Sequence, residues 1–264
     1  MTSTAAETGP PPTETTREES RERAAIAPEV AAVTLLELED VETYYGESHV
    51  LEGVTLSVEA GEVVALVGRN GVGKTTTLRS ILQLTPPREG TITYRGDELV
   101  GLEPHEVAER GVGWIPEDRR IFSQLTVAEN VRVAVPDGAD TGQRVATVYD
   151  TFPILEERRD QEAGTLSGGQ QQMLALARGL VGDNDLLLVD EPSEGLAPQI
   201  VADVAEALAD AATETTLLLV EQNLPLALDL ADRFYVLDKG QVVDDGDTAD
   251  VSADDERLRR YLSA

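Results

Sequence analysis

The sequence predicts an α/β fold in which helices cover both faces of a parallel β-sheet. Short apolar runs that suit buried strands alternate with segments whose apolar residues recur at helical spacing. A glycine-rich loop directly follows one of these apolar runs and opens a helix. The chain of 264 residues is long enough for one large domain with a substantial core, and it contains no internal repeat.

The first part of the domain is predicted to be mostly strands. Apolar alternation over 35–45 and 50–59, broken by a turn at 46–48, indicates an antiparallel pair. The continuous apolar run at 63–67 is typical of a buried parallel strand. We then expect, in order, a helix over about 73–84 that ends before Pro86 and Pro87, a strand at 90–95, a helix at 103–110 and a buried strand at 112–115.

The second part begins with a helical insert over about 117–181. Helical spacing at 127–135 and 142–152, with a turn at 136–138, indicates two helices, and a third is expected at 170–181. The α/β alternation then resumes. The expected elements are a strand at 186–190, a helix at 198–212, a strand at 216–221, a helix at 223–231, a strand at 234–238 and two short pieces near the C-terminus.

Residues 1–33 differ in composition from the domain predicted at 34–264. They are rich in Pro, Thr, Glu and Arg and have almost nothing to bury. We expect a disordered tail that acts as a solvating appendage, with a short recruitment segment as the alternative.

The net charge of −29, with 50 acidic against 21 basic residues, restricts the partners of the chain. Such a surface repels phosphate backbones, so we expect no nucleic-acid partner. It is typical of proteins from a very salty cytoplasm, where salt screens self-repulsion; an acidic interaction surface is the alternative. The chain has no cysteine, which excludes disulfides and thiol chemistry. No apolar run approaches the ~18 residues that cross a bilayer, and no signal peptide is visible.

The glycine-rich loop has the features of a phosphate-binding loop. Its glycines let main-chain amides curl around phosphates, and the following helix adds positive potential. Lys74 is one of only two lysines and is expected to reach the β- and γ-phosphates of a nucleotide. The Thr75 hydroxyl is a candidate Mg²⁺ ligand. The complete set of loop candidates is Gly68, Arg69, Asn70, Gly71, Val72, Gly73, Lys74, Thr75 and Thr76.

Two adjacent acids end the apolar strand predicted at 186–190. The four apolar residues before Asp190 indicate that its carboxylate is buried near the phosphate loop, where it can hold Mg²⁺ through its water shell. Glu191 follows at once and is the candidate general base. Surface decoration is the alternative for two acids in an acidic chain, but the apolar run argues against it.

The sequence LSGGQ at 166–170 lies between these two motifs. Read alone, Ser167, Gly168 and Gly169 would be an ordinary helix N-terminus that suits an anion. Read 93 residues after Lys74 and 23 before Asp190, the string completes a set of three motifs that resembles the ATP-binding cassette (ABC) ATPases.

The resemblance implies a P-loop NTPase fold with a RecA-like parallel-sheet core, an antiparallel β subdomain and a helical subdomain. It implies ATP and Mg²⁺ as cofactors. It also implies that Ser167, Gly168 and Gly169 contact the γ-phosphate held by a second cassette, with Gln170 setting the loop. Because the chain is too short for two cassettes, the second is expected from another chain, identical or related.

Three further candidates depend on the resemblance. Tyr45 resembles the aromatic residue that stacks on adenine, with Tyr44 as the neighbouring candidate and core packing as the alternative. Glu117 stands where many cassettes have Gln. Gln222 stands where many have His, at the position that senses the γ-phosphate; its amide can donate a hydrogen bond but cannot become cationic.

The strings IPEDRRIFSQLTVAENV, VDEPSEGLAPQIV and LLLVEQNLPLALDLADRFYVLDKGQVV indicate a subgroup. They resemble the ATPase subunits of branched-chain amino-acid importers, in the variant with Glu-Gln-Asn. This resemblance implies two membrane permeases, an extracellular binding protein and a peripheral position at the cytoplasmic face of the membrane. It also implies that motion reaches the permeases through a groove near 117–129. A urea or short-amide importer, a soluble non-transport ABC ATPase and a regulatory ATP-binding module without turnover are the alternatives.

Overall fold

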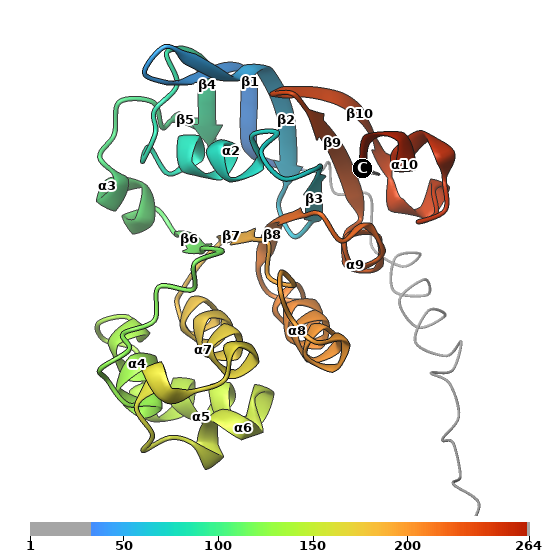
Figure 1. Cartoon of the computed structure of the whole chain (residues 1–264). Helices are drawn as coiled ribbons and strands as arrows, with labels where there is room; N and C mark the ends of the chain where they lie inside the picture. The colour runs from blue at the N-terminus through green and yellow to red at the C-terminus, as the bar shows by residue number, and fades with distance from the viewer. Residues whose placement is uncertain (1–32, 263–264) are drawn as a thin grey trace, which may run out of the picture. The chain divides into compact units, whose positions relative to one another are not determined.

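Two β-sheets frame the part of the chain that the computed structural model describes, residues 33–262 (Figure 1). The smaller sheet is antiparallel, with strand order β2-β1-β4-β5. Its strands are β1 (Thr34–Tyr45), β2 (Ser48–Glu59), β4 (Glu89–Tyr94) and β5 (Asp97–Glu98). The antiparallel pair is therefore as predicted. The predicted tail, apart from Val33, lies outside the described residues.

The larger sheet has six strands in the order β10-β9-β3-β8-β7-β6. Its parallel strands are β3 (Val63–Val67), β6 (Val112–Ile115), β7 (Leu186–Asp190), β8 (Thr216–Glu221) and β9 (Arg233–Asp238). At one edge β10 (Gln241–Asp247) runs antiparallel to β9, and its residues alternate between exposed and half-buried. The α/β fold with a parallel-sheet core is confirmed.

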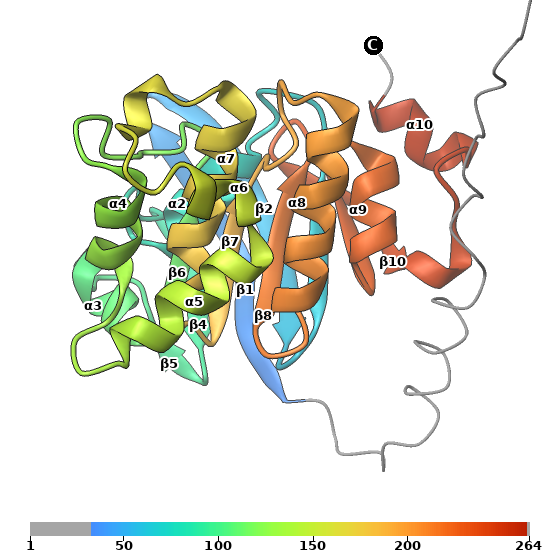
Figure 2. The same ribbon diagram turned by 90° about the horizontal axis from the view of Figure 1, so that it is seen from below.

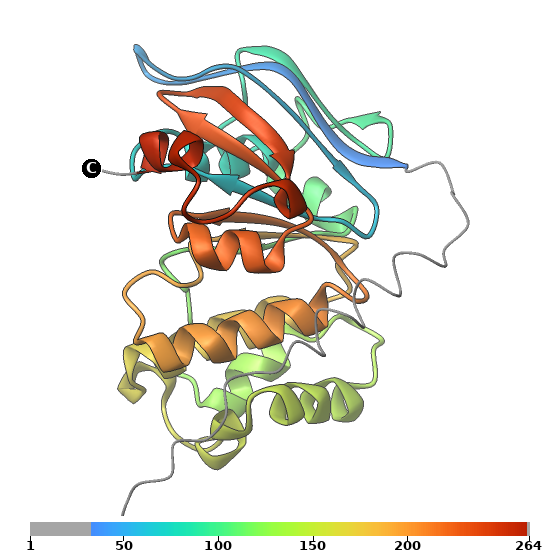
Figure 3. The same cartoon turned by 90° about the vertical axis from the view of Figure 1, so that its right-hand side faces the viewer.

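The central strands are apolar throughout because each of their faces packs against a different layer. Alternate residues of β3, β7 and β8 belong to two separate cores. One core contains Val64 and Leu66 of β3 and includes the antiparallel sheet, α2 (Lys74–Ile81) and α3 (Pro104–Glu109). The other contains Val63, Ala65 and Val67 and includes helices on the opposite face, so that the parallel sheet lies between the two layers (Figure 3).

The helices of that opposite face lie side by side across the sheet (Figure 2). They are α7 (Gly168–Leu180), α8 (Pro198–Ala211) and α9 (Leu224–Leu230), followed near the C-terminus by α10 (Glu256–Leu262). The helical insert adds α4 (Val127–Ala134), α5 (Thr141–Thr151) and α6 (Pro153–Glu157), which pack around α7. Short 3₁₀ turns complete the described elements at Ala163–Thr165 and Thr248–Asp250.

Several boundaries differ from the predictions for local reasons. The helix predicted to reach residue 84 ends at Ile81, because Gln83 adopts a left-handed backbone with φ 57° and its side chain donates to the Ser80 carbonyl. The helix predicted from residue 170 begins two residues earlier, because Ser167 caps it. The short α6, which starts at a proline, and the edge strand β10 were not predicted as such.

No helix among residues 33–262 is both long and apolar enough to cross a bilayer.

Candidate functional site

The phosphate loop, Asp190, Glu191 and Gln222 lie at the carboxyl ends of three adjacent parallel strands. Val67 at the end of β3 pairs with Glu221 at the end of β8, and Asp190 at the end of β7 pairs with Val220 of β8. The phosphate loop, Glu191 and Gln222 each follow one of these strand ends. The edge beyond the carboxyl ends of parallel strands is where ligands of open α/β sheets bind.

The phosphate loop presents main-chain amides at the start of α2. Gly73 is the N-cap with φ 117°, a conformation that favours glycine, and no side chain caps the helix. The first amides of α2 therefore remain available to an anion, which the helix dipole also favours. A Cβ on Gly68 would lie 2.5 Å from the Leu237 carbonyl oxygen of β9, so this position requires glycine as well.

Lys74 is held inside the loop by three oxygen atoms. Its Nζ donates to the carbonyls of Gly68 at 2.8 Å and Arg69 at 3.0 Å, and it lies 2.9 Å from Glu191 Oε1. Only 3% of the side chain is exposed. A buried ammonium fixed in this way is oriented for a phosphate before any ligand arrives.

Glu191 reaches Lys74 because the chain turns sharply after β7. Its backbone is left-handed, with φ 46°, which is unfavourable for a residue with a Cβ. The Glu191 N–H donates to the Val220 carbonyl at 2.9 Å, so the turn is tied to β8. Backbone strain of this kind is concentrated at functional sites.

Asp190 and Thr75 form the part of the site that suits a cation. Thr75 Oγ1 donates to Asp190 Oδ1 at 3.1 Å, whereas the buried Asp190 Oδ2 has no hydrogen-bond partner among the described residues. Burial raises the pKa of Asp190 to about 6, with a further contribution from the Glu191 carboxylate and an opposing one from the Thr75 hydrogen bond. An unpaired buried carboxylate oxygen is a ready metal ligand.

Most of the phosphate loop and Glu191 line one cavity of about 260 Å³, whereas Asp190 does not line it. Seven of the predicted site residues line it together with Glu191, and Val50 joins them from β2 without having been predicted. The full lining is Val50, Asn70, Gly71, Gly73, Lys74, Thr75, Thr76, Glu117 and Glu191. The cavity thus combines phosphate-loop groups with Glu117 and Glu191, the two acids that the sequence had predicted for the site.

Glu117 brings a further acid to the rim of this cavity. Its pKa is raised by burial, by a hydrogen bond with Glu194 and by the negative charges of Glu194, Asp190 and Glu191. Negative groups therefore surround Glu117.

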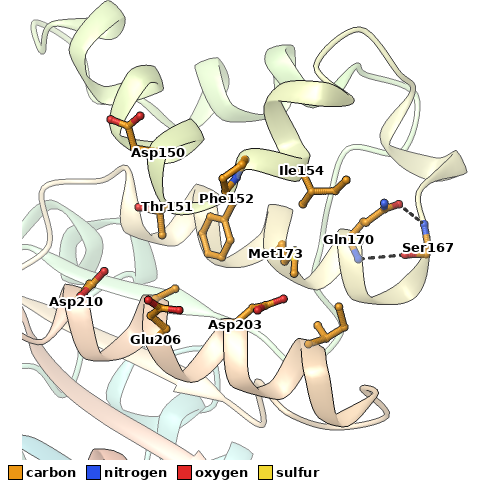
Figure 4. Close-up of a pocket in the computed structure, with 13 residues that line it drawn as sticks. Asp150, Thr151, Phe152, Ile154, Ser167, Gln170, Met173, Asp203, Glu206 and Asp210 are labelled. Atoms are coloured by element: carbon orange, nitrogen blue, oxygen red, sulfur yellow. Dashed lines mark hydrogen bonds between the residues drawn. The ribbon is translucent and has the colours of Figure 1, made fainter. Parts of the chain in front are cut away.

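The signature segment lies apart from the phosphate cavity. Ser167 Oγ accepts the Gln170 N–H, and Gln170 Oε1 accepts the Ser167 N–H at 3.0 Å, which forms a capping box at the start of α7 (Figure 4). Ser167 and Gln170 line a different cavity, of about 570 Å³, between α5, α6, α7 and α8. None of the signature residues lines the cavity that contains Lys74.

The two tyrosine candidates have different surroundings. The Tyr44 ring stacks on His49 with a centroid distance of 4.1 Å, and the Arg88 guanidinium lies 4.3 Å from the Tyr44 ring centroid. Tyr45 is 44% exposed. Of the two rings, Tyr45 is therefore the more accessible to a stacked base.

Gln222 is exposed and does not line the phosphate cavity. The residue before it, Glu221, is buried and bonded to main-chain amides on both sides of the site, a role that sequence reasoning missed. The signal was present, because Glu221 ends a run of apolar residues just as Asp190 does.

Known proteins are similar to this chain in sequence and in fold. The family described as ABC transporter matches residues 51–194. The chain is 44% identical to the high-affinity branched-chain amino acid transport ATP-binding protein BraG of Pseudomonas aeruginosa, over 79% of this chain and 91% of that protein. It is 36% identical to the probable branched-chain amino acid transport ATP-binding protein LivF of Archaeoglobus fulgidus, over 82% and 93%.

A solved dimeric cassette in a post-hydrolysis state bound to ADP and phosphate superposes with a TM-score of 0.73 at 25% identity, covering 81% of this chain and 99% of that one. The family match covers more than half of the sequence, and the relatives align over most of their lengths. The chain belongs to the ABC transporter family and is one of its ATPases.

Proposed function

We propose that this chain is the ATP-hydrolysing subunit of an importer for branched-chain amino acids. The observation that carries the proposal is the cavity in which the phosphate loop, Lys74 and Glu191 meet. A cation for the phosphates and a carboxylate for the attacking water are the two groups that hydrolysis of a phosphoanhydride requires.

Mg²⁺ accompanies ATP in this proposal. Thr75 and Asp190 would hold it, since their oxygens are adjacent and Asp190 Oδ2 is unpaired among the described residues. No group of three or more His, Cys, Asp or Glu residues within 33–262 is arranged to hold a metal alone, which suits an ion shared with phosphate oxygens. When bound, the ion neutralises charge on the phosphates.

The protein side chains have separate roles in binding and hydrolysing ATP. Lys74 binds the β- and γ-phosphates, Glu191 orients and deprotonates the attacking water, and the Gln222 amide donates a hydrogen bond to the γ-phosphate. Tyr45 stacks on adenine, where its exposure leaves the ring accessible. Glu117 lies in the wall of the same cavity, where it would face the bound nucleotide.

A second cassette completes the site. The distance in the fold between the signature and the phosphate cavity supports this, because Ser167, Gly168 and Gly169 serve no phosphate bound beside Lys74 of the same chain. The pair lies at the cytoplasmic face of the membrane beneath two permeases, and an extracellular binding protein delivers the substrate. Closure on ATP is transmitted through the groove near 117–129.

The substrate class is supported by the relatives named for branched-chain amino-acid transport. In its native host, we expect a Glu191→Gln variant as the only copy to reduce uptake of labelled leucine, isoleucine and valine to background. Uptake of labelled urea should not change. Loss of urea uptake with normal leucine uptake would favour the urea and short-amide alternative, and no effect on any solute would contradict an importer.

Lys74→Ala should weaken ATP binding by about ten- to a hundred-fold, the usual value of hydrogen bonds between charged groups. Lys74→Arg should also bind weakly, because a planar guanidinium does not fit between the Gly68 and Arg69 carbonyls. Calorimetric titration of the folded variants with ATP measures this. Undiminished affinity in Lys74→Ala would refute the assigned role.

Glu191→Gln should lower the Mg²⁺-dependent ATPase rate by about 10²–10⁴-fold, the usual contribution of a general base, while ATP still binds. The variant should accumulate as a nucleotide-trapped dimer in size-exclusion chromatography. Glu214→Gln, which removes one charge at the opposite end of β8, is the matched control and should turn over normally. Turnover near wild type in Glu191→Gln would mean that another group is the base.

Asp190→Asn should stabilise the nucleotide-free protein in a pH-dependent way. Since burial raises the Asp190 pKa from 3.8 to about 6, ionisation destabilises the fold as pH rises through this range. The free energy of unfolding of the variant should exceed that of the wild type by on the order of 2 kcal/mol above pH 7, and the two should be nearly equal at pH 4. Thermal melting in molar KCl at several pH values tests this, and a difference independent of pH would contradict it.

A further inference from the structure

A buried carboxylate that has no assigned role links the two segments behind the phosphate cavity. Glu221 ends β8 and is 1% exposed. On one side lies the segment that follows Glu191, and on the other lies Gln222. Glu191, which precedes the first segment, and Gln222 both have roles in the proposed function.

The Glu221 side chain bonds to main-chain amides of both segments. Its Oε1 accepts the Ser193 N–H at 3.0 Å. Its Oε2 accepts the N–H groups of Gln222 at 3.1 Å and Asn223 at 3.0 Å. One carboxylate therefore fixes the distance between the main chain at Ser193, two residues after Glu191, and the main chain at Gln222.

Burying a carboxylate to accept three amide N–H groups costs desolvation free energy. Burial raises the pKa of Glu221, whereas its hydrogen bonds with Ser193 and Asn223 oppose that rise. A carboxylate in such a place costs free energy that its hydrogen bonds must offset, which directs attention to what its geometry does. Starting α9 does not need it, because the Asn223 side chain already caps the helix by accepting the Leu226 N–H.

The fold gives this bridge a direct connection to the reacting groups. The Glu191 N–H bonds to the carbonyl of Val220, the residue before Glu221. The turns after β7 and β8 are thus joined twice, once through the backbone at Val220 and once through the Glu221 carboxylate. Small shifts of a group that orients water or phosphate reduce turnover strongly.

We propose that Glu221 is a positioning residue for ATP hydrolysis. It holds two segments, the one that follows Glu191 and the one that contains Gln222, in one fixed arrangement. The inference rests on the proposed roles of Glu191 and Gln222. Both carboxylate oxygens of Glu221 accept main-chain N–H groups, so in this proposal it acts through the chain and not on the nucleotide. It acts by keeping two main-chain turns in register.

The test compares Glu221→Gln with Glu62→Gln in steady-state ATPase and thermal melting, in molar KCl. Glutamine keeps the shape of the side chain but replaces one acceptor oxygen by a donor, which opposes an amide N–H. Glu62 is the matched control: it is also largely buried, accepts the Glu59 N–H at 2.9 Å and pairs with Arg233, but it precedes β3 at the opposite end of the sheet.

For Glu221→Gln we expect kcat to fall by about ten- to a hundred-fold. KM for ATP should stay within about two-fold of wild type, because Lys74 and the phosphate loop are untouched. Glu62→Gln should lower the melting temperature at least as much and leave kcat unchanged. Glu221→Asp, which keeps the charge but withdraws it by one methylene, should show an intermediate kcat, and it carries the test if Glu221→Gln does not fold.

A kcat within about two-fold of wild type in a folded Glu221 variant would overturn the proposal. So would parallel losses of kcat and stability in the Glu221 and Glu62 variants, which would mark a purely structural role. Different results would count against the proposed function itself. Wild-type protein without Mg²⁺-dependent turnover would overturn both. Turnover near wild type in Glu191→Gln would mean that another group is the base, and it would overturn this inference while leaving ATP hydrolysis by the chain in place.

Discussion

The buried contact between Lys74 and Glu191 is the interaction on which the site depends. It joins the loop after β3 to the turn after β7, two strands separated in the sheet by β8. Each charge would be left uncompensated in a buried position without the other, so the pair constrains both segments. The glycines of the phosphate loop and the left-handed backbone at Glu191 are the local conformations that permit it. A lysine that already faces carbonyl and carboxylate oxygens is prepared for phosphate oxygens.

The same fold that gathers these groups keeps the signature away from them. Ser167 begins α7, which packs against α8 on the helical face of the sheet, and its capping box presents an exposed helix N-terminus. An anion suits that N-terminus, but Lys74 lies in another cavity. In the proposed function, a second cassette resolves this separation. ATP binding would then close the pair, and hydrolysis in one chain would be coupled to motion between the two.

Sequence patterns predicted the parts of the structure that local chemistry determines. The apolar runs predicted the central strands, and the acid at the end of one run predicted the buried Asp190. The prediction failed where distant contacts decide. The strand β10, which was not predicted as such, depends on pairing with β9. Glu221 was missed because its partner Ser193 lies 28 residues away, although its position after an apolar run was visible.

The most direct test of the transporter function is to identify the proteins that associate with this chain. The tagged chain is purified by affinity from detergent-solubilised native membranes in molar KCl, and mass spectrometry identifies the proteins that accompany it. The account predicts two polytopic permeases, with or without a related ATPase, and an associated binding protein for branched-chain amino acids. Recovery of ribosomal, DNA-repair or cluster-assembly proteins without any membrane protein would contradict it.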